Sequence, residues 1–218
     1  GPALAPATIR GTHATLHHAL KRAADEGLIP FNPAEKVTPP RVQNAPKRVL
    51  THDHLEKFLC TIRFDPIWHD FFYTELTTGL RRGELCGLTW EDFDSEAGTL
   101  KVRRTIHARK GGELEAGETK TYAGQRTILL PYSTTQLLKE RRTAALTKWI
   151  FPDPLRPERP VNPSSAYRRL KELLKQAGLP SLRFHDLRHT FATHALASGV
   201  DAKTLSGILG HTKASFTL

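Results

Sequence analysis

The stretch His185-Asp186-Leu187-Arg188-His189 determines how the rest of the chain is interpreted. His185 and Arg188 are three residues apart, so a helix would place both side chains on one face. A guanidinium binds two phosphate oxygens at once, and an imidazole can donate or accept a proton near neutral pH. The pair is therefore suited to holding a phosphate group.

Two further stretches carry residues of the same kind. Thr78-Gly79-Leu80-Arg81-Arg82-Gly83-Glu84 contains two adjacent arginines, and Leu209-Gly210-His211 places a histidine at the expected end of a helix. Glu84 lies three residues after Arg81 and can orient its guanidinium, although an Arg–Glu pair of this kind is often only a surface ion pair. Together the three stretches predict a site that grips one phosphodiester from several sides.

The composition limits the class of protein. The 218 residues carry a net charge of +10, with 39% hydrophobic and 25% charged residues, which is typical of a globular protein with a basic surface. Such a surface favours nucleic acid or an anionic membrane as partner, and no apolar run is long enough to span a bilayer. Nucleic acid is therefore preferred. Cys60 and Cys86 are too few for a disulfide framework and are expected to be buried, reduced thiols.

Hydrophobic periodicity predicts a mainly α-helical protein with one small antiparallel sheet, an α+β fold. The expected helices are residues 7–26, 52–62, 66–78, 82–88, 134–146, 163–177, 186–198 and 201–209. Thr51 is expected to cap the start of the second. Residues 98–106 alternate as a strand does, and residues 120–124 and 126–130 are expected to form two strands around a tight turn. Residues 109–118 contain three glycines among charges and are expected to form a loop or a projecting hairpin.

A linker is expected to divide the chain into two parts. Residues 38–48 are rich in proline and basic side chains and lack periodicity, as is typical of a semi-rigid linker. One or two helices cannot bury a core alone, so residues 1–37 are expected to be the end of a helical domain, and residues 49–218 a second domain. The start at Gly1-Pro2 and the absence of methionine favour a trimmed fragment of a longer protein.

Taken together, the motifs resemble the tyrosine recombinases of the phage integrase family, and most closely the integrases of conjugative transposons. The matching stretches are TTGLRRGEL at 77–85, TKTYAGQRTILL at 119–130, HDLRH at 185–189 and ILGHT at 208–212. The resemblance implies that residues 49–218 are the catalytic recombinase domain. It also implies that residues 1–37 are the last helices of a core-binding domain, which clamps DNA from the opposite face.

By this resemblance, the catalytic positions of the family fall on Arg81, Lys120, His185, Arg188 and His211, with Glu84 as acidic support. The family cuts one DNA strand with a tyrosine, which forms a 3′-phosphotyrosine and a free 5′-hydroxyl, and rejoins strands without metal, ATP or another cofactor. Arg81 and Arg188 would hold the non-bridging oxygens, and Lys120 would protonate the leaving oxygen. His185 would exchange the proton of the nucleophile, and His211 would hydrogen-bond the phosphate.

The nucleophile itself is not found at a matching position. In the family, the tyrosine follows the last of these histidines at a distance that lies beyond Leu218. The tyrosines that are present stand elsewhere and are expected to be core or surface residues; they are Tyr73, Tyr122, Tyr132 and Tyr167. The 218 residues are therefore expected to bind DNA without cutting it.

The resemblance also implies the partners. These are double-stranded DNA at transposon ends and target sites, and further copies of the chain in a synaptic dimer or tetramer, in the bacterial cytoplasm. The basic residues expected to contact the DNA backbone are Lys47, Arg48, Arg82, Arg103, Arg109 and Lys110. The segment 109–118 is expected to touch a neighbouring subunit or DNA.

Three other functions remain open. A non-catalytic DNA-binding protein on the same scaffold would use the same basic surface. A metal-dependent nuclease needs carboxylates that the motifs do not offer; His185 and His189 have a spacing compatible with zinc, but Arg188 would repel the cation and His189 is expected to pack between helices. A type IB topoisomerase uses similar chemistry, and only the wording of the motifs and the core-binding remnant favour recombination.

Overall fold

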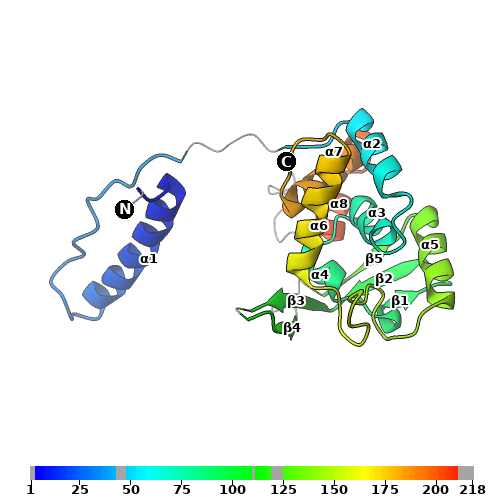
Figure 1. The fold of residues 1–218 in the computed structure, drawn as a ribbon. Helices are drawn as coiled ribbons and strands as arrows, with labels where there is room; N and C mark the ends of the chain where they lie inside the picture. The colour runs from blue at the N-terminus through cyan, green and yellow to red at the C-terminus, as the bar shows by residue number, and fades with distance from the viewer. Residues whose placement is uncertain (1–2, 43–47, 110, 119–124, 211–218) are drawn as a thin grey trace. The chain divides into compact units, whose positions relative to one another are not determined.

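The computed structural model describes residues 3–42, 48–109, 111–118 and 125–210 (Figure 1). The chain divides into two compact units, Gly1–Pro46 and Lys47–Leu218. The division falls inside the proline-rich segment 38–48. Within the described residues, none of the helices is long and apolar enough to cross a membrane.

The first unit consists of helix α1 (Pro6–Asp25) and a return segment. Pro6 stands at the first helical turn, where its missing N–H costs no hydrogen bond. Asn32 Nδ2 donates to the carbonyl of His17 at 3.2 Å, and this fixes the return segment on the helix. No residue of α1 is buried, and Leu16 is 52% exposed. The helix is therefore held by hydrogen bonds rather than by an apolar core.

The second unit carries most of the helices and all the described strands. Its helices are α2 (His52–Ile62), α3 (Trp68–Thr78), α4 (Arg82–Cys86), α5 (Tyr132–Thr143), α6 (Pro163–Gln176), α7 (Phe184–Ala197) and α8 (Ala202–Leu209), with a short 3₁₀ turn η1 (Trp90–Asp92). Thr51 caps α2 as predicted, because its hydroxyl accepts from His54 N at 3.3 Å. Gly210 ends α8 in the left-handed conformation, with a φ of 65°.

Antiparallel strands are present as predicted, and those described form two small sheets where the sequence indicated one. β1 (Phe93–Asp94), β2 (Thr99–Val102) and β5 (Arg126–Leu129) form one sheet in the order β1-β2-β5, and β3 (Arg104–Ala108) pairs with β4 (Leu114–Glu118) in the other. The buried residues Leu100, Val102 and Ile106 keep the same parity through β2 and β3, so the pattern alone does not reveal that the pairing partner changes.

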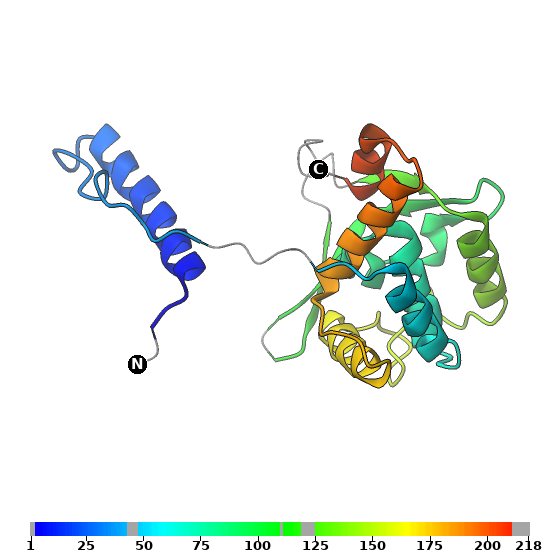
Figure 2. The same ribbon diagram turned by 90° about the horizontal axis from the view of Figure 1, so that it is seen from above.

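The remaining strand predictions concern residues 109–118 and residues 120–124. The segment 109–118 belongs to the β3–β4 hairpin, which extends away from the rest of the second unit (Figures 1 and 2). The described partner of β5 is β2, with Ile128 opposite Leu100. The strand expected at 120–124 lies outside the described residues.

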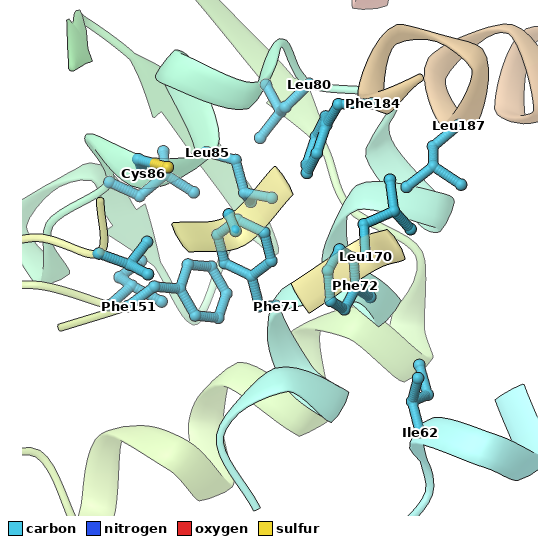
Figure 3. Close-up of a cluster of buried hydrophobic side chains, with 14 of the residues drawn as sticks. Ile62, Phe71, Phe72, Leu80, Leu85, Cys86, Phe151, Leu170, Phe184 and Leu187 are labelled. Carbon is cyan, nitrogen blue, oxygen red and sulfur yellow. The ribbon is translucent and has the colours of Figure 1, made fainter. Parts of the chain in front are cut away.

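The core of the second unit is built around α3. Phe71 and Phe72 of α3 are fully buried, and the Phe71 ring meets Phe151 and Phe184 edge to face at 5.2 and 6.2 Å (Figure 3). Burying one such side chain stabilises a fold by about 1.5–3 kcal/mol. This packing fixes the C-terminal end of α3, where the Gly79–Glu84 motif begins.

The two cysteines have different environments. Cys86 is buried in this core, and burial raises the pKa of its thiol far above the ordinary value. Cys60 is exposed, so the prediction that both thiols are buried is wrong for Cys60. It lies two residues from each of Phe58 and Ile62, the buried residues of α2, and a helix places it on the opposite face.

Candidate functional site

The turn between α3 and α4 requires glycine. Gly79 has a φ of 59°, and a Cβ atom there would lie 2.4 Å from Cδ1 of Phe191. The turn leaves Leu80 fully buried and directs the carbonyl of Gly79 to Arg188, whose Nη1 donates to it at 2.8 Å. One glycine therefore joins two of the three sequence motifs.

Arg81 is oriented by the third residue of the helix that it begins. Glu84 accepts hydrogen bonds from the backbone N–H of Arg81 at 2.9 Å and from its Nη1 at 2.8 Å. The Glu84 side chain is 2% exposed and that of Arg81 is 43% exposed. Because the acid is buried, the pair is not a surface ion pair: it holds a partly exposed guanidinium at a fixed place.

Arg126 completes this ion cluster, and the sequence analysis did not single it out. Its Nη1 and Nη2 donate to the two carboxylate oxygens of Glu84 at 3.1 and 2.8 Å. Burial by itself raises the pKa of Glu84, but the bonds from Arg126 and Arg81 outweigh it and lower that pKa below the ordinary value. The signal was strand parity, since Arg126 shares a face of β5 with the buried Ile128.

Arg188 lies almost wholly inside the protein. Its side chain is held by the Gly79 carbonyl and by the Leu209 carbonyl, which accepts from Nη2 at 2.5 Å. Burial, followed by the nearby charge of Arg81, lowers the pKa of Arg188 to about 10. The residue is 2% exposed and still cationic at neutral pH.

Three successive carbonyls at the end of α8 each accept from a different arginine. The pairs are Arg126 Nε with Ile208 O at 2.7 Å, Arg188 Nη2 with Leu209 O at 2.5 Å, and Arg81 Nη2 with Gly210 O at 3.3 Å. The C-terminal end of a helix carries a partial negative charge, which favours cations there. The end of α8 therefore gathers three guanidinium groups without using a carboxylate.

His185 lies in the first turn of α7 with an exposed side chain. Partial burial and then the charge of Arg188 lower the pKa of His185, so its imidazole is mostly neutral at pH 7 and can accept a proton. The ring of His189 lies edge-on to it, with centroids 4.6 Å apart. The start of α7 repeats the pattern of α4, because Asp186 accepts from the backbone N–H of Arg183 at 2.8 Å.

Several of these side chains line one cavity of about 360 Å³. Arg81, His185 and Arg188 line it together with Arg82 and Tyr167. Tyr167, expected to be a core or surface residue, packs against the core and also lines the cavity. The guanidinium of Arg82 lies 5.9 Å from the centre of the Tyr167 ring, a cation–π distance. Arg81 and Arg82 therefore face different partners, as their adjacency in the chain predicts.

The remaining predicted positions do not line the cavity within the described residues. Lys120, His211, Lys47 and Lys110 lie outside the described residues. The other residues expected to meet the DNA backbone have exposed side chains and local partners. These are Arg48 with Ser181 O at 3.1 Å, Arg103 with Asp92 at 3.6 Å and Arg109 with Glu115 at 2.7 Å. In the described part of the chain, no cluster of three or more His, Cys, Asp or Glu is placed to hold a metal ion.

The family model for "Phage integrase family" matches residues 48–218, the whole of the second unit except its first residue. The chain belongs to the phage integrase family. Its fold, mainly α-helical with small antiparallel sheets, is the fold of that family's catalytic domain, as the sequence predicts. The recognition made from the four motifs is confirmed.

Relatives of this phage integrase family member include named recombinases. It is 29% identical to the tyrosine recombinase XerC-like protein of Caldanaerobacter subterraneus subsp. tengcongensis, over 96% of this chain and 60% of that one. It is 32% identical to tyrosine recombinase XerA of Pyrococcus furiosus, over 84% of this chain and 60% of that one. The chain thus spans about 60% of the length of these relatives.

Solved structures give the same result. The Tn1549 transposon integrase, in complex with transposon right end DNA, superposes with a TM-score of 0.87 at 26% identity, over 99% of this chain and 75% of that one. A lambda integrase dimer bound to a core site superposes with a TM-score of 0.68 at 23% identity, which supports the fold alone.

Proposed function

We propose that this chain is the DNA-binding and strand-transfer part of a site-specific recombinase of a mobile element, acting on bacterial DNA. The observation that carries the proposal is the convergence of Arg81, Arg188 and His185 on one cavity. Membership of the phage integrase family and the likeness to a transposon integrase bound to transposon DNA support it.

In the proposed reaction, Arg81 and Arg188 bind the two non-bridging oxygens of the scissile phosphate. A guanidinium has five N–H donors, so holding a carbonyl of α8 or Gly79 is compatible with binding a phosphate oxygen. Their charge stabilises the phosphorane in which negative charge develops, and one such preorganised donor is typically worth about 10²–10³ in rate. Glu84 and Arg126 position Arg81 and do not touch DNA in this scheme.

The proton transfers are assigned to three other residues. His185, with its lowered pKa, takes the proton of the attacking tyrosine and returns it when the strands rejoin. Lys120 protonates the leaving 5′ oxygen, and His211 donates a hydrogen bond to the phosphate. The oxygen of a tyrosine displaces the 5′ oxygen at phosphorus, and a 5′-hydroxyl of another strand later reverses that displacement.

The domain roles and the assembly belong to the same proposal. Residues 1–37 act as the last helices of a core-binding domain, residues 38–48 as the linker, and residues 49–218 as the catalytic domain. Double-stranded DNA is the substrate, and the active form is a synaptic dimer or tetramer. The β3–β4 hairpin contacts a neighbouring subunit or DNA, so its deletion is expected to weaken synaptic assembly; unchanged assembly would reject that role.

We further propose that the 218 residues bind DNA but do not cut it. The family's nucleophile has no counterpart among the four tyrosines. Tyr132 is 79% exposed on α5, and Tyr73 lies on α3 within a different groove. Among the tyrosines that the structure describes, Tyr167 lines the cavity, so it is the residue to eliminate first as a substitute nucleophile.

The test compares this chain with one extended at its C-terminus by a segment that carries a tyrosine. Both are mixed with a nicked duplex from the end of the element, in EDTA, and the readout is an adduct of protein and DNA that survives SDS. The adduct is expected from the extended chain and not from its Arg188→Ala variant. An adduct from the shorter chain that disappears in Tyr167→Phe would assign attack to Tyr167. Tight binding without an adduct from either chain would favour a non-catalytic DNA-binding protein.

A further inference from the structure

Glu75 of α3 forms part of the wall of the same cavity, and the scheme above gives it no role. Its side chain is fully buried. Neither carboxyl oxygen has a hydrogen-bond partner among the described residues. The acid therefore lines the proposed phosphate site, and neither of its oxygens is hydrogen-bonded within the described residues.

An unpartnered buried carboxyl group needs an explanation. Buried polar groups are almost always hydrogen-bonded, and leaving one unpaired costs about 1–3 kcal/mol, or more if it is charged. The neighbouring acids obey this rule: Glu84 is bound by two arginines, and Asp186 is bound by Arg183. Arg188 donates to the carbonyls of Gly79 and Leu209, and the Glu75 oxygens accept from no described residue. The described part of the folded chain thus supplies no partner, and a ligand in the cavity can.

The charges around Glu75 determine its protonation state. Burial is the largest influence and raises the pKa of Glu75 well above the ordinary 4.5; Arg188 of α7 opposes this, and Glu84 of α4 adds to it. The thiol of Cys86 is a further ionisable group in electrostatic contact. The other titratable or charged groups that line the cavity are Arg81, Arg82, Tyr167, Arg183 and His185. The raised pKa favours the neutral carboxylic acid, whose O–H is a hydrogen-bond donor.

We propose that Glu75, as a neutral acid, donates a hydrogen bond to an oxygen of the phosphodiester that occupies this cavity; this rests on the function proposed above for the site. The neutral acid adds a donor beside the cationic ones without adding charge. An ionised Glu75 would repel the diester, so ionisation of Glu75 and occupancy of the cavity oppose each other. A carboxylic acid kept neutral by an apolar site to stabilise an oxyanion is established chemistry in other enzymes.

The first experiment uses the whole chain labelled with ¹³C in the glutamate carboxyl groups, and dimethyl phosphate, the smallest phosphodiester, as probe. The Glu75 resonance is assigned by its loss in Glu75→Gln. Glu75 is expected to titrate above the other glutamates, and the probe is expected to shift both this resonance and the His185 ring signals. Because the probe binds the neutral form, it should also move the Glu75 midpoint to higher pH.

The second experiment measures the affinity for dimethyl phosphate as the pH is raised. Wild-type affinity should fall as Glu75 ionises. Glu75→Leu removes the donor and should weaken binding about tenfold, the ratio expected for one hydrogen bond to a charged group. Glu75→Gln keeps an N–H donor that cannot ionise, so it should restore most of the affinity and abolish the alkaline loss. Glu96→Gln, at an exposed turn, is the matched control and should behave as wild type.

The outcomes separate this inference from the function on which it rests. A probe that shifts His185 but not Glu75 would leave the phosphate site intact and overturn the role of Glu75, as would a Glu75 that is ionised at neutral pH. A probe that shifts neither residue would overturn both. If Glu75→Leu does not fold, as judged by its thermal transition, the titration of the wild-type resonance decides alone.

Discussion

Arg126 binds both carboxylate oxygens of Glu84, and the two side chains are 8% and 2% exposed. The same carboxylate orients Arg81. The buried Arg126–Glu84 pair does not line the cavity, but it fixes the position of the Arg81 guanidinium, which does. Arg126 acts on the site through Glu84, and it is not proposed to touch DNA.

Arg126→Leu should be strongly destabilising. It leaves Glu84 buried with only the partly exposed Arg81, and breaking a buried pair on one side typically costs about 3–5 kcal/mol. Urea unfolding of the second unit measures the change. The control is Arg109→Leu, which removes an ion pair at the exposed hairpin and should cost less than about 1 kcal/mol. Equal losses in the two variants would show that the Glu84 cluster is not a special source of stability.

Acid should destabilise the second unit through Glu84. The pKa of Glu84 is lower in the folded chain than its ordinary value of 4.5, so its contribution is present above that value and is lost as the pH falls through the lowered one. Asp186 behaves in the same way relative to its ordinary 3.8. Urea unfolding measured from about pH 7 to about pH 3 should give a free energy of unfolding that declines as the pH falls below the ordinary pKa of these two acids. Glu84→Gln should start lower and decline less; parallel curves for the two proteins would contradict this.

Gly79→Ala should disturb both stability and the site. The left-handed conformation costs an alanine about 1–2 kcal/mol, and the overlap with Phe191 adds to it. The carbonyl that holds Arg188 moves with the turn. Thermal unfolding and DNA affinity check the two effects. Gly207→Ala is the control, because nothing lies within 4 Å of the added Cβ in α8; it should be neutral or stabilise by up to about 1 kcal/mol.

Binding of duplex DNA should weaken steeply with salt. Each phosphate neutralised by an arginine or lysine releases counterions, so the logarithm of affinity falls linearly with the logarithm of salt concentration. Arg48→Ala should reduce that slope by about one if Arg48 contacts a phosphate. Fluorescence anisotropy at several salt concentrations measures it, with the exposed Arg156 replaced by alanine as the control. A slope near zero in the wild type would count against contacts along the DNA backbone.

Much of the fold follows from local signals in the sequence. The ends of α2 and α8 were predicted from Thr51 and Gly210, whose capping chemistry depends only on their neighbours. The exchange of partners between β2 and β3 was missed because alternation reports which face is buried and not which strand is opposite. The wrong prediction for Cys60 has a different cause. Helical spacing from Phe58, visible in the sequence, already places Cys60 on the exposed face of α2.

The sequence predicts part of the site. It marks three of the side chains that line the cavity and misses the roles of two buried ones. Arg81, His185 and Arg188 carry recognisable motifs, and the structure brings these three together at one cavity. Arg126 lies within the stretch 119–130 but is not one of its expected catalytic positions, and Glu75 lies in none of the four stretches. The surroundings of both come from other elements that only tertiary packing brings near. A glutamate within an amphipathic helix reads as an exposed residue until its burial is seen.

The row of three carbonyls at the end of α8 has one more consequence. The geometry of the helix spaces the Ile208 and Leu209 carbonyls, and the left-handed residue that ends the helix places the Gly210 carbonyl. Each of the three arginines therefore binds a position that the backbone fixes. A shift of α8 by a single residue would place a different carbonyl opposite each of the three guanidinium groups at once. The end of α8 therefore fixes the spacing of Arg81, Arg126 and Arg188 from one another, and two of these, Arg81 and Arg188, line the cavity.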